Sequence, residues 1–182
     1  MPIGLVHPGL VTPIMFKKDK SHAFCSSQWV SVFRTMGVRF NQNVWKLIPD
    51  SYDDIDGCLF GLIDPNDGAS FGLDFTPRGD NDTYEYEDTG AEYFMRLLDS
   101  DAGARVLHRF TLMLGCVAFK CTAYSYRNAR FGNQVVVRGI WIGAHETIGV
   151  SMSWPALLPF DGTHFPPKLS ILMRHCEVAV SQ

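Results

Sequence analysis

The chain has 182 residues, of which 46% are hydrophobic and 19% are charged, enough to fill a globular core. Its net charge is −3 and its 16 Lys and Arg residues are scattered, so the composition does not predict nucleic-acid binding. No apolar run approaches the roughly 20 residues that a membrane-spanning helix needs. We therefore expect one domain over residues 1–182, with no membrane span.

The N-terminal arm, residues 1–20, is apolar, contains three prolines and places its lysines after the apolar part. A secretory signal has the opposite order, so we predict a cytoplasmic protein. The arm is either packed or a loose tail. The cysteines are odd in number and form no CxxC pair, which is typical of buried free thiols in a reducing compartment. They are Cys25, Cys58, Cys116, Cys121 and Cys176.

After the arm, the stretch QWVSVFRTMG has apolar residues at helical spacing, ending at Gly37. A short helix is one interpretation, but WVSVF is equally compatible with a strand. The next stretch, GVRFNQNVWKLIPDSY, predicts a strand that leads into an irregular segment. It opens the core domain, which we expect over residues 38–178.

A hairpin is predicted over residues 58–76. The runs CLFGLID and ASFGLDFT are joined by Pro65-Asn66-Asp67-Gly68, which is strong turn chemistry. In the second run large apolar residues alternate with small or polar ones, so one face of this strand is apolar and the other is not. The apolar residues are Phe71, Leu73 and Phe75, and the others are Ser70, Gly72 and Asp74.

A polar loop then leads into the stretch TGAEYFMRLLDSDAG, which predicts a helix capped by Asp88 or Thr89. Its apolar residues form one stripe over about three turns. These residues are Tyr93, Phe94, Leu97 and Leu98.

Residues 105–154 predict a meander of three or four antiparallel strands. In the first run Val106, His108, Phe110 and Leu112 are expected to share a face. The same is expected of Val117, Phe119, Cys121 and Ala123 in the second run, and of Ile148, Val150 and Met152 in the fourth. The third run, VVVRGIWIG, is almost continuously apolar, which predicts a central strand covered on both faces, with little room for an active site.

Pro166 and Pro167 precede KLSILMRH, where Leu169, Leu172 and Met173 have helical spacing, so a closing helix is expected. The whole order predicts an α+β fold, an antiparallel meander packed with helices in a layered sandwich.

Motifs for chemistry are absent from the sequence: it has no GxSxG, SxxK, P-loop, dinucleotide fingerprint or HExxH. His108 alternates with apolar neighbours, as a structural histidine does. We therefore predict a protein that is not an enzyme and that needs neither a metal nor a cofactor.

The acidic segment, residues 80–92, carries six carboxylates and no Lys or Arg. Three interpretations are open: a solvated loop before a helix, a docking surface for a basic partner, or a calcium site at Asp80-x-Asp82. The docking hypothesis adds two tyrosines as contact area. Its residues are Asp80, Asp82, Tyr84, Glu85, Tyr86, Glu87 and Asp88.

The order of segments resembles the PsbP-like/DcrB-like domains. NVWKLIPDSY would correspond to their opening motif, CLFGLIDPNDGASFGLDF to their hairpin, AEYFMRLLD to their helix, residues 105–154 to their meander and PKLSILMRH to their closing helix. In the opening segment Trp45 and Pro49 stand in an order unlike the family's usual one. The resemblance implies a non-enzymatic domain that binds macromolecules, as in type VI secretion, and it transfers no site residue.

The function expected from the sequence is therefore that of a bacterial immunity-type protein. Such a protein occludes a cognate toxin by docking the acidic segment on a basic surface. One alternative is a type VI secretion effector chaperone, which would expose a large apolar patch. A second alternative is a small-ligand-binding protein or enzyme with a pocket lined by His108, Tyr124 and Trp141.

Overall fold

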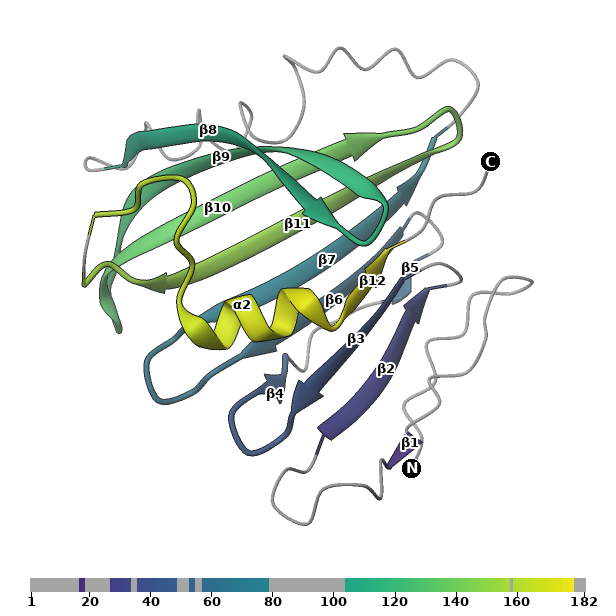
Figure 1. The fold of residues 1–182 in the computed structure, drawn as a ribbon, viewed down its shortest axis with the longest axis horizontal. Helices are drawn as coiled ribbons and strands as arrows, with labels where there is room; N and C mark the ends of the chain where they lie inside the picture. The colour runs from purple at the N-terminus through teal and green to yellow at the C-terminus, as the bar shows by residue number, and fades with distance from the viewer. Residues whose placement is uncertain are drawn as a thin grey trace.

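The structure is a computed structural model that describes residues 17–18, 27–33, 36–48, 53–54, 57–78, 104–157 and 159–178. Two antiparallel sheets and one short helix, α2 (Pro167–Arg174), make up its regular structure in these ranges (Figure 1). The small sheet contains β1 (Lys17–Lys18), β2 (Ser27–Phe33), β3 (Met36–Asn41) and β12 (Cys176–Val178). The large sheet contains β4 (Lys46–Leu47), β5 (Asp53–Asp54), β6 (Gly57–Ile63), β7 (Ser70–Pro77), β8 (Arg105–Leu114), β9 (Val117–Asn128), β10 (Gly132–Ile142) and β11 (Glu146–Pro155).

The strand order of the large sheet is β4-β6-β7-β11-β10-β9-β8, with β5 paired to β6. The hairpin β6–β7 and the four-stranded meander β8–β11 both form as the sequence predicts. The hairpin joins the meander through its last strand, because β7 pairs with β11 and Ser70 lies opposite Ser153. Strands about 80 residues apart in the chain are therefore neighbours at the centre of the sheet.

The small sheet settles the alternative that was open for residues 28–37. The described residues of this stretch, 28–33 and 36–37, lie in strands, since β2 and β3 pair antiparallel with a register shift between Ser31 and Phe33. β12 then pairs with β3, which brings a strand that the sequence pattern did not reveal beside the N-terminal hairpin.

The closing helix α2 begins at Pro167, where the missing N–H of proline costs no helical hydrogen bond. Its Leu169 and Leu172 are buried, and Met173 packs against the same core. The helix is therefore confirmed, and Figure 1 shows it with β12 across one face of the large sheet.

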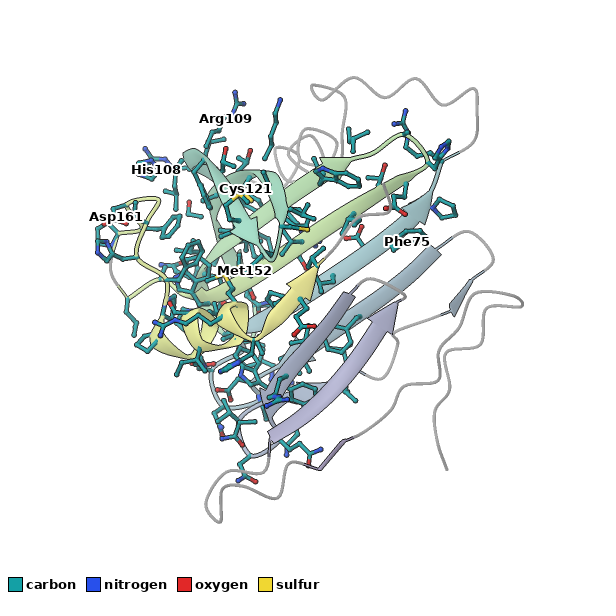
Figure 2. All side chains as sticks on the ribbon, turned by 45° about the vertical axis from the view of Figure 1, so that its right-hand side comes forward. Phe75, His108, Arg109, Cys121, Met152 and Asp161 are labelled. Atoms are coloured by element: carbon teal, nitrogen blue, oxygen red, sulfur yellow. The ribbon has the colours of Figure 1, made fainter. Side chains whose placement is uncertain are left out.

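We call the face of the large sheet that points toward α2 the core face. Alternate residues of its strands are almost fully buried, as the apolar periodicity predicts. They include Phe60 and Leu62 of β6, Phe71 and Leu73 of β7, Phe119, Cys121 and Ala123 of β9, Val135 and Val137 of β10, and Ile148, Val150 and Met152 of β11. Figure 2 shows Cys121 and Met152 within this core and Arg109 pointing away from it.

In β8 the predicted alternation fails at one position. The register shifts between Val106 and His108, so Val106 lies opposite Tyr124 while His108 lies opposite Ala123. Because directly paired residues share a face, Val106 and His108 are on opposite faces. Phe110 and Leu112 do pack against the core, as expected.

The fold is antiparallel and dominated by its sheets. The prediction of a sandwich layered with helices is too rich in helix for the described residues, where α2 is the one helix. The helix predicted to begin at Asp88 or Thr89 lies outside the described residues. In the part of the chain that is described, no helix is long and apolar enough to cross a membrane.

Candidate functional site: a cavity on the outer face of the large sheet

The face opposite the core face, here called the outer face, carries small side chains where β7 and β11 meet. The register places five residues of five strands side by side in one row across the sheet. The two residues in the middle of the row are serines, while the flanking residues are larger, which leaves a hollow floor between them. In order across the sheet the row is Ile63, Ser70, Ser153, Val136 and Tyr124.

The walls of this hollow rest on glycines. Ile48 lies directly over Gly61, where an added Cβ would stand 2.7 Å from its Cδ1 atom. The Phe131 ring lies over Gly68, where an added Cβ would clash with the ring carbons. Gly68 also has a φ of +75°, a left-handed conformation that favours glycine. The glycines of the predicted hairpin thus let two apolar side chains lie flat against the backbone.

The turn that carries Phe131 is fixed by Asn128. Its Oδ1 atom accepts hydrogen bonds from the backbone N–H groups of Arg130, at 2.8 Å, and of Phe131, at 3.0 Å. The Arg130 guanidinium lies 5.0 Å from the centre of the Phe131 ring. This side of the hollow is therefore held by the β9–β10 turn.

Together these groups line a half-open cavity with a volume of about 390 Å³. This is within the range of roughly 300–1,000 Å³ that is usual for small-molecule sites. Its described lining residues mix apolar, aromatic and hydrogen-bonding side chains. They are Ile48, Ile63, Gly68, Ser70, Tyr124, Tyr126, Asn128, Phe131, Gln134, Val136, Arg138, Ser151, Met152 and Ser153.

Gln134 is the most informative of these residues because it is polar and only 3% exposed. Its Nε2 atom donates to the carbonyl of Phe131 over 3.4 Å, at the long limit for a hydrogen bond. Its Oε1 atom is buried and has no hydrogen-bond partner among the described residues. A buried acceptor without a donor destabilises the folded state by about 1–3 kcal/mol. A hydrogen-bond donor placed in the cavity would remove this cost.

The serine hydroxyls on the floor have spare hydrogen-bonding capacity. The Oγ atoms of Ser70 and Ser153 are 2.8 Å apart, and Ser153 also lies 3.4 Å from the carbonyl of Gly68. A hydroxyl donates once and accepts twice, so the pair can still accept from a ligand.

Asp74 and Arg138 place opposite charges on the outer face beside Tyr124. Burial raises the pKa of the Asp74 carboxyl, and the nearby positive charge of Arg138 opposes this rise. Burial likewise raises the pKa of Tyr124 to about 12, so its phenol is neutral at physiological pH. Arg138 interacts with both groups, which means that its charge is already engaged within the protein.

The pocket that the sequence suggested for the second alternative does not form with the predicted residues. Of His108, Tyr124 and Trp141, Tyr124 alone lines the cavity. His108 is exposed on the core face, where its ring is 6.3 Å from that of Phe160, and Trp141 packs against the core. Figure 2 shows His108 at the same end of the molecule as Asp161.

The sequence also predicts that the third meander run is covered on both faces, but the described residues do not cover it in that way. Val135 and Val137 of β10 are buried in the core, but Val136 is half-buried and lines the cavity. Val136 faces the hollow because the next residues across the sheet, Ser153 of β11 and Ser70 of β7, are too small to cover it.

The acidic segment is the surface on which the sequence predicts docking. Asp80, Asp82, Tyr84, Glu85, Tyr86, Glu87 and Asp88 lie outside the described residues, so the docking hypothesis stays a prediction, as does the calcium alternative. Within the described ranges, no three His, Cys, Asp or Glu side chains gather as a metal site requires.

The cysteine prediction holds in part. Cys121 and Cys176 are buried free thiols, but Cys116 is exposed. Burial raises the pKa of both buried thiols to about 12, which makes them poor nucleophiles. The side chains of Cys25 and Cys58 are outside the described set.

Sequence reasoning missed Gln134, Arg138, Ser151 and Ser153 as site residues. One signal did point toward them: the small or polar face of the second hairpin run, with Ser70 and Gly72. The pairing of that strand with β11 is what turns its small face into the floor of a cavity.

Fold and site together define a sheet-dominated antiparallel protein with a small cavity of mixed polarity on its outer face. No family model matches the chain, and no curated protein matches its sequence. Among solved structures, the chain is similar to a protein of Bacteroides thetaiotaomicron VPI-5482, with a TM-score of 0.45 and 9% identity. The match covers 80% of this chain and 45% of that protein, so the chain spans less than half of its length.

Proposed function

We propose that the protein binds a small molecule in the outer-face cavity and does not transform it. The observation that carries this proposal is the buried Gln134 amide at the edge of a cavity of about 390 Å³, whose oxygen has no partner in the described part of the chain. A fold gains nothing from such an acceptor, because an apolar residue of the same shape would avoid the cost. A ligand that donates to it would recover the cost and explain why a polar residue stands there.

Binding, rather than catalysis, follows from the kinds of groups present. The described lining residues offer hydroxyls, amides, Arg138 and apolar surfaces. Such groups orient a ligand, but none of them is a strong base at neutral pH.

The test is a fragment screen by methyl NMR on the wild-type protein and on two variants. Ser153→Leu fills the floor of the cavity, and Thr76→Leu is its matched control, since Thr76 is exposed on the outer face of β7 beyond the cavity. We expect fragments to shift the methyl signals of Ile63 and Val136 in the wild type and in Thr76→Leu. The same fragments should not bind Ser153→Leu.

The proposal fails if fragments leave these methyl signals unchanged, or if Ser153→Leu binds them as the wild type does. Circular dichroism and denaturant unfolding of both variants establish that a loss of binding is not a loss of fold.

The immunity-type function remains a second proposal, supported by the charge pattern of residues 80–92 alone. Reversing Asp82, Glu85 and Asp88 to Lys should weaken binding to a cognate basic partner and raise its off-rate. An unchanged affinity would remove this surface from consideration. The effector-chaperone alternative gains no support from the described surface. Of its exposed large apolar residues, Val106 and Leu107 lie at one end of β8 and Met113 lies near the other end, while Leu47, Leu157 and Ile171 lie on other segments.

A further inference from the structure

The hydrogen-bonding groups around the cavity include both donors and acceptors. Gln134 presents an acceptor that no described residue satisfies, and the Ser70–Ser153 pair can accept further hydrogen bonds. Asn128 uses its Oδ1 atom in the turn, so its NH₂ group remains as a donor group in the lining. A ligand that satisfies this set must itself both donate and accept at several neighbouring atoms.

The rest of the lining is apolar and partly aromatic. Phe131 stands beside Gln134, whose amide reaches the Phe131 carbonyl, and Tyr126 lies opposite Gln134 in the register of β9 and β10. A ligand that reaches the Gln134 amide therefore has aromatic rings within reach. Its own surface must carry C–H groups next to its polar atoms.

A net charge on the ligand is disfavoured at this site. The positive charge of Arg138 is coupled to Asp74 across the same face, and the Tyr124 phenol is neutral. An anionic ligand would compete with Asp74 for Arg138, and a cationic ligand would be repelled by Arg138. Desolvating an unpaired charge is costly, so a neutral ligand fits best.

We propose that the ligand is a neutral sugar of one or two rings, an inference that rests on the proposed binding function. A sugar hydroxyl donates to Oε1 of Gln134, and other hydroxyls meet the serine pair and the NH₂ group of Asn128. The C–H face of the sugar ring packs on Phe131 and Tyr126. Sugars combine, in one small neutral molecule, adjacent hydroxyls that donate and accept with apolar C–H faces.

The experiment is a binding panel read by isothermal titration calorimetry and by the Ile63 and Val136 methyl signals. The neutral probes are glucose, galactose, N-acetylglucosamine, maltose and cellobiose. Glucuronate and glucosamine serve as charged counterparts, and indole serves as a flat apolar probe. Gln134→Leu removes the buried acceptor, and Asn133→Leu is the matched control, because Asn133 is the adjacent amide and is exposed.

We expect at least one neutral sugar to shift the cavity methyl signals. It should bind at least tenfold more weakly to Gln134→Leu and with unchanged affinity to Asn133→Leu. Glucuronate and glucosamine should bind more weakly than glucose.

Two failures are distinguishable. If indole or a charged probe shifts the cavity methyl signals and the neutral sugars do not, the sugar assignment is overturned while the binding function stands. If neither these probes nor the fragments of the broader screen reach the cavity, both proposals are overturned.

Discussion

The two faces of the large sheet are built from the same strands, yet one is filled and the other is hollow. On β7, Phe71 and Leu73 are at most 1% exposed on the core face, while Ser70 between β6 and β11 is half-buried on the outer face. The same contrast recurs on β11, where Met152 is buried and its neighbours are Ser151 and Ser153. Because successive residues of a strand point to opposite faces, a single alternating pattern encodes both surfaces.

This contrast separates the residues that hold the fold from those that are available for function. Large apolar residues on the core face stabilise the sheet against α2. Small residues on the outer face contribute little packing, so their chemistry can serve a ligand. The predictions below test this division, from the largest expected effect to the smallest.

Phe71→Ala should cost about 3–5 kcal/mol of unfolding free energy, because it leaves a cavity in the filled face. Ser70→Ala, one residue away, should cost about 1 kcal/mol or less, since it removes one hydroxyl contact to Ser153. Urea unfolding followed by circular dichroism measures both values. Similar costs for the two substitutions would contradict the division between faces.

Gly68→Ala should destabilise the protein more than Gly132→Ala. Both glycines have positive φ, +75° and +73°, so either alanine should cost about 1–2 kcal/mol for the backbone conformation. An added Cβ at Gly68 also meets the Phe131 ring, whereas at Gly132 no atom of the described residues that could clash lies within 4 Å. Comparing the loss of unfolding free energy in Gly68→Ala with that in Gly132→Ala isolates the contact that forms the cavity wall. Equal losses would show that the Phe131 ring does not pack on Gly68.

Asp64→Asn should cost about 1–2 kcal/mol at neutral pH, because it breaks an ion pair that ties α2 to the β6–β7 turn. Lys168 Nζ lies 2.7 Å from Asp64 Oδ2, at a position where Asp64 is 8% and Lys168 25% exposed. Burial acts to raise the pKa of Asp64, but hydrogen bonds from Lys168 and Asn66 outweigh it and hold the pKa below 3.8.

A depressed pKa in the folded state gives stability that is present above the unfolded pKa and is lost as the pH falls through the folded pKa. The difference in unfolding free energy between the wild type and Asp64→Asn should therefore have its full value above pH 3.8 and shrink at lower pH. Denaturant unfolding between pH 7 and pH 2.5 measures it. A difference that stays constant with pH would mean that the carboxylate charge does not hold the helix.

Thiol labelling should report the two faces without changing stability. Cys121 on the core face is 3% exposed and its pKa is raised to about 12 by burial, so it should stay unlabelled in the native protein. A cysteine introduced by Ser153→Cys should label readily on the outer face. Peptide mapping by mass spectrometry reads each site, and protection of the introduced thiol would show that the hollow is closed.

Much of this fold follows from residue periodicity. The turn Pro65-Asn66-Asp67-Gly68 and the alternating runs on either side predict the β6–β7 hairpin, and Leu169 and Leu172 predict α2. Periodicity finds strands but does not say which distant strands pair, and β12 is too short to show any pattern.

The cavity could not be predicted for the same reason. Ser70 and Ser153 are adjacent because β7 pairs with β11, a contact between segments about 80 residues apart. The apolar run of β10 predicts burial on both faces, because the sequence of β10 does not show that small serines of β11 and β7 lie beside Val136. The register shift after Val106 is a tertiary feature of the same kind.

The central claim is that Gln134 is polar for the sake of a ligand and not for the fold. The most direct test is the unfolding free energy of Gln134→Leu without ligand. Since Oε1 has no partner within the described ranges and the bond from Nε2 is long, we predict that the variant is as stable as the wild type or more stable. A loss greater than about 1.5 kcal/mol would show instead that the amide holds the fold together, and would contradict the account.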